Sequence, residues 1–233
     1  MSNPTSEQTA EFNRSYIGAR PELLDLVPRS AVSILDIGCS VGELGRSVID
    51  RNPDARVHGI EIDPDMAAVA RQRLHSVLVA DLEDVSLPEQ FSPARFDCII
   101  MADVLEHLRD PWAVLDQAVE VAADGATIIA CLPNVRHYST IYSLVFRGRW
   151  PYRKRGIHDR THLRFFARKN ILELFAHRSL QIQDIRTKYR ITERPGGINR
   201  VARFLALPLL RGFLAYQYIV VARKTGHGKG AGV

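Results

Sequence analysis

The chain has 233 residues, of which 46% are hydrophobic and 24% are charged. This balance excludes a wholly disordered chain and allows one large domain with a sizeable core. The formal net charge of +5 at pH 7 mildly favours an anionic partner. The three cysteines, Cys39, Cys98 and Cys131, lie inside apolar runs, where reduced cysteines are usually found. Their spacing is not that of a zinc site.

The stretch from Met1 to Arg14 is polar and lacks the basic start and apolar run of a secretory signal peptide. Together with the unpaired cysteines, this predicts a cytoplasmic protein. We expect an N-terminal helical segment over residues 1–30, a main domain over residues 31–225, and a flexible Gly-rich tail over residues 226–233.

The middle of the chain alternates apolar runs with amphipathic runs. The predicted strands are Ser33–Ile37, Val57–Ile62, Ser76–Ala80, Phe96–Met101 and Thr127–Leu132. The predicted helices between them are Glu43–Arg51, Pro64–Leu74 and Pro111–Ala123. Strands that alternate with helices over short connections predict a doubly wound α/β domain, in which helices cover both faces of a mostly parallel sheet.

The alternation stops after the fifth strand. Two further strands, at Ile182–Tyr189 and Tyr216–Arg223, complete a predicted seven-stranded sheet, and a helix is predicted at Lys169–His177. The connections over residues 133–168 and 191–215 are longer than the usual loops of α/β units, so we expect them to be insertions on the substrate side.

The first insertion carries the basic character of the chain. From Pro133 to Lys169, ten residues are Lys or Arg and only Asp159 is acidic. The second insertion contains the apolar stretch Val201–Leu214, which is too short and too interrupted to span a bilayer. We expect this stretch to be buried against the sheet, and peripheral contact with a membrane surface is the second interpretation.

The strongest motif follows the first strand and reads Asp36-x-Gly38-x-Ser40-x-Gly42. Ligands of open parallel sheets lie beyond the carboxyl ends of the strands. Small residues there let the backbone approach a ligand, and the next helix directs its N–H groups at it. The carboxylate of Asp36 would repel a pyrophosphate but suits a cofactor with an ammonium or sulfonium charge. A tight turn without any ligand is the alternative.

Acidic residues also follow the next three strands. Glu61 ends the second strand, where a carboxylate can accept both hydroxyls of a ribose, whereas Asp63 is expected to cap the next helix. Asp81, beside Leu82, closes the third strand and can accept the exocyclic amine of adenine. Asp103 follows the fourth strand. Because the carboxyl ends of parallel strands share one edge, we expect these acids to form a row there.

These motifs, together with Asp103-Val104-Leu105-Glu106-His107, resemble those of class I S-adenosylmethionine-dependent methyltransferases. The resemblance covers the chain from about Ile34 to Leu132 and implies a Rossmann-like methyltransferase fold with S-adenosyl-L-methionine as cofactor. Ser40 replaces the usual middle glycine of the family and still leaves room for the cofactor. The residues that the resemblance assigns to the cofactor are Asp36, Gly38, Ser40, Gly42, Glu61, Ile62, Asp81, Leu82, Ala102 and Asp103.

The stretch 103–107 is similar to that of ubiquinone-biosynthesis O-methyltransferases, and Leu132-Pro133-Asn134 with Phe146–Pro151 resembles the methionine-biosynthesis protein W group. The resemblance implies methylation of an oxygen on a small, anionic or lipid-linked metabolite of the glycan or quinone type. The alternatives are a regulatory partner that keeps the fold without catalysis, and an RNA methyltransferase. No aromatic pattern of an RNA-binding module supports a nucleic-acid partner. The oligomeric state is left without a prediction.

An oxygen nucleophile needs a base, and His107 is the candidate because it follows the fourth strand and histidine titrates near neutral pH. Simple packing beside Leu108 is the alternative. The candidate substrate contacts, whose side chains can bind phosphate or carboxylate groups, are Asn134, Tyr138, Tyr142, Arg149, His158 and His162. His158 and His162 are four residues apart, as zinc ligands on a helix are, but no third ligand is indicated, so no metal is expected.

Overall fold

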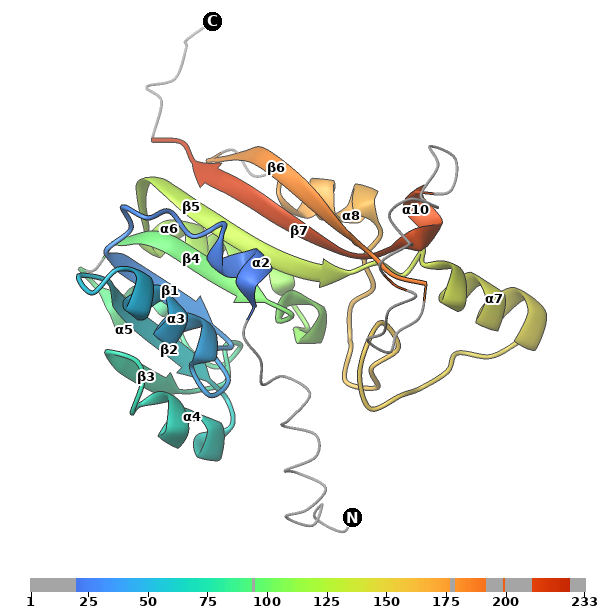
Figure 1. Cartoon of the computed structure of the whole chain (residues 1–233), viewed down its shortest axis with the longest axis horizontal. Helices are drawn as coiled ribbons and strands as arrows, with labels where there is room; N and C mark the ends of the chain where they lie inside the picture. Colours follow the sequence, from blue (N-terminus) through green and yellow to red (C-terminus); the bar gives the residue numbers. More distant parts are fainter. Residues whose placement is uncertain (1–19, 94, 177–178, 192–198, 200–210, 227–233) are drawn as a thin grey trace, which may run out of the picture.

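The computed structural model describes residues 20–93, 95–176, 179–191, 199 and 211–226. A seven-stranded sheet with the order β3-β2-β1-β4-β5-β7-β6 forms its centre (Figure 1). The strands are β1 Ser33–Ile37, β2 Arg56–Glu61, β3 Ser76–Val79, β4 Phe96–Ala102, β5 Ala122–Pro133, β6 Leu180–Tyr189 and β7 Ala215–Lys224. Strands β1 to β5 pair in parallel, and β7 runs antiparallel to both β5 and β6. The predicted doubly wound seven-stranded fold is therefore confirmed.

Short helices connect and flank the strands. They are α2 Pro21–Leu24, α3 Glu43–Arg51, α4 Pro64–Ala70, α5 Leu87–Phe91, the 3₁₀ turn η1 Leu105–His107, α6 Pro111–Val121, α7 Tyr138–Arg147, α8 Arg168–Leu174 and α10 Arg211–Leu214. As predicted, the Asp63 carboxylate caps α4, where it accepts hydrogen bonds from the backbone N–H groups of Asp65 and Met66. None of the helices in these described ranges is long and apolar enough to cross a bilayer.

The sheet separates two hydrophobic cores because successive side chains of a strand point to opposite faces. In β4, Cys98 and Ile100 belong to the core under α2, α3 and α4, whereas Ile99 and Met101 belong to the core under α5, α6 and α8. All four side chains are fully buried. The inner strands are therefore apolar on both faces, which explains why their sequences read as continuous apolar runs.

The switch point of the sheet lies between β1 and β4, where the strand order changes direction. Register aligns the ends of the central strands there: Ile37 pairs with Ile60 on one side and with Met101 on the other. Glu61 and Ala102, one residue further along, therefore stand at the level of the loop that follows β1. This alignment positions the candidate site.

Some of the predicted elements have the predicted bounds, and others end or begin a few residues away from them. Both β1 and α3 have the predicted bounds, but α4 ends at Ala70 instead of Leu74, and α6 ends at Val121 instead of Ala123 because Ala122 starts β5. Ala122 pairs with Phe96 of β4, and this pairing outweighs its helical preference. Several predictions lie outside the described residues: any helix over residues 1–19, the part of the apolar stretch over 201–210 and the tail over 227–233.

Gly59 of β2 gives a test of this packing. A Cβ atom at Gly59 would lie 2.5 Å from Cys39 Sγ and 3.0 Å from Leu74 Cδ1, so Gly59→Ala overpacks the core. We expect the free energy of unfolding to fall by about 1–3 kcal/mol in urea titrations. Gly212→Ala, where the nearest atom is Arg136 Nη1 at 3.8 Å, is the control and should change it by less than about 0.5 kcal/mol. Equal stability of the two variants would contradict the packing described.

Candidate active site

The loop after β1 is held against the end of β2 by backbone hydrogen bonds. The N–H groups of Gly38 and Cys39 both donate to the Ile60 carbonyl, at 2.8 and 3.0 Å. Gly38, Ser40 and Gly42 all have positive φ, at 72°, 52° and 77°. Ser40 thus occupies a left-handed conformation that glycine adopts at no cost, so this position requires an unusual backbone and not merely a small side chain.

Gly38 is also a point of close approach between two loops. A Cβ atom there would lie 2.5 Å from Cγ2 of Val104, which follows β4. The loops after β1 and β4 therefore touch at the switch point, where they leave no space for a larger residue. Such a backbone-lined position suits a ligand that lies directly against the main chain.

Glu61 organises the same loop from the end of β2. Its side chain is buried, and its carboxylate accepts hydrogen bonds from the N–H groups of Ser40 at 2.7 Å and of Asp63 at 3.0 Å. Each bond uses a different oxygen, so each oxygen keeps further acceptor capacity. Glu61 is therefore fixed in place and can still accept hydroxyl hydrogens from a ligand.

The four acids expected after strands 1 to 4 do gather at the carboxyl edge of the sheet. Asp36 pairs with Gly59, and Glu61 lies two residues beyond Gly59, so the two carboxyl groups share one face. Asp81 lies two residues beyond the end of β3, and Asp103 directly follows β4. We name Asp36, Glu61, Asp81 and Asp103 the acidic edge.

Asp36 is the most buried member of the acidic edge, with 3% of its surface exposed. Burial raises the pKa of its carboxyl group to about 7, and the neighbouring Glu61 carboxylate adds to this increase, whereas Arg20 opposes it. A negative charge at Asp36 is thus costly in the protein alone. A cationic ligand at the acidic edge would remove much of this cost.

Asp103 makes contacts that the sequence did not predict. Its carboxylate accepts a hydrogen bond from Arg20 at 2.7 Å and another from the side chain of Gln217 in β7. Although burial opposes it, the Asp103 carboxylate raises the pKa of Arg20, so the guanidinium keeps its charge. Arg20, at the start of α2, thereby fastens this helix to the acidic edge. The remaining predicted cofactor residues differ in exposure: Leu82 is buried, Asp81 and Ala102 are half-buried, and Ile62 is exposed.

A cavity of about 740 Å³ opens beside Asp103, and we name it the main cavity. Its acidic lining residues are Asp103, Glu106 and Asp159, and its basic lining residues are Arg20, Arg153, Lys154, Arg155, Lys188 and Arg190. His107 and His162 also line it. The main cavity therefore combines an acidic end at the sheet with a basic wall from the first insertion and β6.

His107, the predicted base, lies in the main cavity at the end of η1. Its Nδ1 atom is 3.1 Å from Thr161 Oγ1, and that hydroxyl donates to Asp159 Oδ1 at 2.7 Å. Because the Thr161 hydrogen points to Asp159, its oxygen accepts from Nδ1–H of His107, and Nε2 carries the lone pair. Burial lowers the pKa of His107, so the ring is neutral at pH 7.

His162 lies against His107, with ring centroids 4.7 Å apart. Its Nδ1 atom is 3.2 Å from the Ile157 carbonyl, which can only accept, so Nε2 carries the lone pair here too. Burial, and next the imidazole of His107, lower the pKa of His162 to about 4. Two neutral imidazoles with the same tautomer therefore face one cavity.

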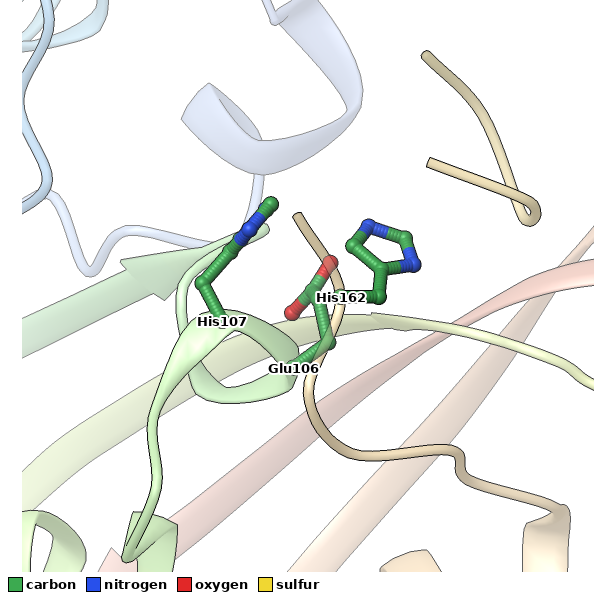
Figure 2. A group of neighbouring side chains, drawn as sticks. All are labelled: Glu106, His107 and His162. Atoms are coloured by element: carbon green, nitrogen blue, oxygen red, sulfur yellow. The ribbon is translucent and has the colours of Figure 1, made fainter. Parts of the chain in front are cut away.

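Glu106 completes this group. Its side chain is 1% exposed, and Oε2 has no hydrogen-bond partner. Burial, and next the charge of Asp103, raise the pKa of Glu106 well above its usual range. The Glu106 carboxylate lies between the imidazoles of His107 and His162 (Figure 2), and we name these three residues the Glu–His cluster.

The other predicted substrate residues lie elsewhere. Tyr138, Tyr142 and Arg149 line a second cavity of about 540 Å³, which shares Arg153 with the main cavity. Asn134 is fully buried and donates to the carbonyls of Gly212 and Ala215, so it joins the end of β5 to α10 and β7.

His158 is also fully buried, and it pairs with Thr140 Oγ1 at 2.9 Å and packs on Trp150. The structure therefore separates His158 from His162, because residues 158–162 form turns and not a helix that would place both on one face. Sequence reasoning missed Arg20, Thr161 and Gln217 entirely, since each reaches the site only through the tertiary fold.

The buried Asp36 predicts a pH dependence of stability. Its carboxyl group has a pKa of about 7 in the folded chain and near 3.9 in an unfolded chain, so the folded state binds the proton more tightly between these values. Its contribution to stability is therefore lost as the pH rises from about 4 to 7, by roughly 1.4 kcal/mol for each pKa unit.

Asp36→Asn cannot ionise. We expect its free energy of unfolding, relative to the wild type, to increase by a few kcal/mol between pH 4 and pH 8 in urea titrations. The exposed Asp54 provides the control, because Asp54→Asn should show no such trend. A constant difference between Asp36→Asn and wild type across this range would contradict the raised pKa.

Known proteins share this fold and its motifs. The profile of a family described as a methyltransferase domain matches residues 35–128. A malonyl-[acyl-carrier protein] O-methyltransferase from Acetivibrio thermocellus is 31% identical over 121 residues, which are 50% of this chain and 41% of the relative. A ubiquinone biosynthesis O-methyltransferase from Pseudoalteromonas translucida is 31% identical over 116 residues, 48% of each chain. The chain thus matches less than half the length of these relatives.

A solved structure extends the likeness over nearly the whole chain. The crystal structure of a SAM-dependent methyltransferase from Archaeoglobus fulgidus matches with a TM-score of 0.64 and 16% identity, and covers 93% of this chain and 99% of that one. At this identity, the match shows the fold alone. With the strand order and the profile matched over residues 35–128, the chain is thus similar in fold and in its central segment to S-adenosylmethionine-dependent methyltransferases.

Proposed function

We propose that the chain binds S-adenosyl-L-methionine at the acidic edge and transfers its methyl group to an oxygen of a small, anionic or lipid-linked metabolite. The observation that carries this proposal is the fixed Glu61 carboxylate beside the positive-φ loop at the switch point. The names of the two relatives, both O-methyltransferases, support oxygen as the acceptor atom.

The cofactor fits the charges of the acidic edge. S-adenosylmethionine carries a sulfonium and an ammonium group, and the buried Asp36 lies where such a cation would stabilise its ionised form. The ribose hydroxyls would donate to Glu61, which keeps acceptor capacity on both oxygens. The adenine would lie beside Asp81 and Leu82, which follow β3.

Methyl transfer is a direct displacement in which the acceptor oxygen bonds to the methyl carbon as the carbon–sulfur bond breaks. The protein must hold these atoms close together, and positioning alone can supply much of the acceleration. An alcohol or phenol must also lose a proton. His107 can take it at Nε2, because Thr161 and Asp159 fix Nδ1 as the protonated nitrogen.

The basic wall of the main cavity supports an anionic acceptor. Its cations come from two separate segments, with Arg153, Lys154 and Arg155 in the first insertion and Lys188 and Arg190 in and beside β6. Together they face the acidic end, where the methyl donor would bind. An acceptor with a phosphate or carboxylate at one end and a hydroxyl at the other would match this distribution.

The outer side of α7 supports a lipid-linked acceptor. Tyr142, Val145 and Phe146 are exposed there, Phe146 to 75%, and Arg147 follows them at the end of the helix. Tyr142 also lines the second cavity, which adjoins the main one through Arg153. An apolar patch with flanking cations is the composition that favours contact with an anionic lipid surface. We accordingly propose a cytoplasmic location with peripheral membrane contact.

Calorimetric titration with S-adenosylhomocysteine, the reaction product, tests the cofactor site. We expect binding to the wild type and at least tenfold weaker binding to Glu61→Gln, a loss of about 1.4 kcal/mol. In glutamine an NH₂ group, which cannot accept a hydrogen bond, replaces one of the two carboxylate oxygens. Asp84→Asn removes an exposed acid after β3 and should bind as the wild type does. Equal affinity of Glu61→Gln and wild type would reject the ribose assignment.

Transfer of labelled methyl groups into lysate and lipid-extract fractions tests the acceptor. We expect the labelled product to bind an anion exchanger or to partition with lipids. For that acceptor, Arg155→Ala should raise KM about tenfold with little change in kcat, since a lost ionic hydrogen bond costs roughly 1.5 kcal/mol or more. Arg56→Ala, at an exposed position in β2, is the control. Cofactor binding without transfer to any fraction would favour the regulatory alternative.

A further inference from the structure

The second cavity has a lining that methyl transfer itself does not require. Among the residues that the structure describes, this lining includes three arginines, Arg147, Arg149 and Arg153, and no acid. We propose that the second cavity binds the phosphate or diphosphate group of the methyl acceptor, apart from the place of methyl transfer. This inference rests on the proposed function and names the class of acceptor within it, a phosphate ester that reaches from one cavity to the other.

The first argument is the charge of the lining. Asp159 is the only acid between residues 133 and 169, and it lines the main cavity, where its carboxylate accepts from the N–H and the hydroxyl of Thr161. The second cavity therefore gathers positive charge without a carboxylate in its wall. A guanidinium group binds an anion through parallel N–H···O bonds, so a phosphate with several oxygens matches three arginines better than a carboxylate with two does.

The second argument is the turn that brings two of the arginines together. Gly148 ends α7 with a positive φ of 59°, and the N–H groups of Gly148 and Arg149 both donate to the Ser143 carbonyl. Ser143 is buried, and its hydroxyl donates to the Arg149 carbonyl at 2.9 Å. These bonds turn the chain back beside α7. Arg147 and Arg149, on either side of the turn, thus line one cavity.

The segment after this turn is anchored by buried side chains. Trp150, which lines the second cavity, packs edge-on against His158 and Phe165, with ring centroids 5.1 and 4.9 Å apart. His158 is fully buried and pairs with Thr140 of α7 at 2.9 Å. Both sides of the cavity are therefore fastened to each other before a ligand arrives, and such preorganisation lowers the entropic cost of binding.

Aromatic side chains indicate what accompanies the phosphate. Tyr142 and Tyr152 line the second cavity and are both exposed. The Arg147 guanidinium lies over the Tyr142 ring, 5.8 Å from its centroid, so its face is covered while its in-plane N–H groups remain donors for an anion. Exposed aromatic rings also pack against a sugar or a base. The volume of about 540 Å³ is in the range of small-molecule sites and has room for such a ring beside the phosphate.

Arg153 joins the two cavities, because it lines both. Its backbone is held in place: its N–H donates to the His158 carbonyl and its carbonyl accepts from the Arg160 N–H, both at 2.9 Å. An acceptor with its phosphate in the second cavity would thus extend past Arg153 and present its hydroxyl to His107 in the main cavity. Binding energy from the phosphate, remote from the reacting oxygen, would then position that oxygen for methyl transfer.

Calorimetric titration of the full chain with inorganic pyrophosphate tests the site. We expect at least tenfold weaker binding to Arg147→Ala and to Arg149→Ala than to the wild type, because each change removes a charged hydrogen-bond donor. Arg160→Ala is the matched control, since it removes an exposed cation of the same insertion that lines neither cavity, and it should bind as the wild type does. Circular dichroism checks that each variant is folded. Equal affinity of Arg149→Ala and Arg160→Ala, or no binding to the wild type, would overturn the proposal.

Tryptophan fluorescence locates the bound anion. The chain has two tryptophans, Trp112 and Trp150, and of these only Trp150 lines the second cavity. We expect pyrophosphate to change the emission of the wild type and of Trp112→Phe, but not that of Trp150→Phe. A change that persists in Trp150→Phe and is lost in Trp112→Phe would place the anion elsewhere and overturn the proposal.

Vesicles separate two carriers of the phosphate group. If the carrier is a lipid, vesicles of phosphatidylcholine and phosphatidylglycerol should sediment the wild type and Arg160→Ala but not Arg149→Ala, and pyrophosphate should release the protein. If the carrier is a soluble ester, pyrophosphate binds and the vesicles sediment none of the three. Both results support the phosphate site. Equal sedimentation of the wild type and Arg149→Ala, without pyrophosphate binding, would indicate a membrane-binding surface in its place and overturn the proposal.

Titration with S-adenosylhomocysteine separates this proposal from the proposed function. Binding of pyrophosphate without S-adenosylhomocysteine would overturn the cofactor site and keep the phosphate site. Binding of S-adenosylhomocysteine without pyrophosphate would overturn the phosphate site and keep the cofactor site.

Discussion

The candidate site depends on one constraint, the attachment of the loop after β1 to the end of β2. The Ile60 carbonyl accepts from two successive N–H groups of this loop, and Glu61 accepts from the next one, that of Ser40. These bonds hold the left-handed residues of the loop against the sheet and leave a backbone-lined space at the switch point. The pairing of β1 with β2 puts Glu61 on the face of Asp36, where its charge adds to the burial that raises the pKa of Asp36.

The sheet and its acidic edge could be predicted because local sequence determines both. The inner strands are apolar on both faces, so runs such as Ser33–Ile37 stand out in the sequence. An acid that follows a strand must lie at the carboxyl edge of a parallel sheet, whatever its neighbours are. The predicted bounds of an element were wrong where a tertiary contact overrides the local preference for helix or strand. Ala122 joins β5 because it pairs with Phe96, which its own sequence context does not indicate.

The Glu–His cluster could not be predicted for a related reason. A spacing of four residues places His158 and His162 together only on a helix, and this part of the insertion forms turns. Burial of His158 against Thr140 and Trp150 anchors the insertion, and this anchor lets Thr161 and His162 reach η1. The path of a long insertion is thus set by a few buried side chains. Its sequence predicted basic character correctly but not which residues meet.

The charges of the main cavity suggest how two ligands of opposite sign could share it. A cationic cofactor favours the acidic edge, and an anionic acceptor favours the wall formed by the first insertion and β6. Asp103 lies between them, already paired with Arg20 and Gln217, so its charge is balanced before either ligand arrives. Glu106 has no such partner and is the one buried acid of this cavity, among the described residues, with an oxygen that lacks a hydrogen bond. The boundary between the two charged regions therefore falls at the Glu–His cluster. A group that accepts a proton there would stand between methyl donor and acceptor.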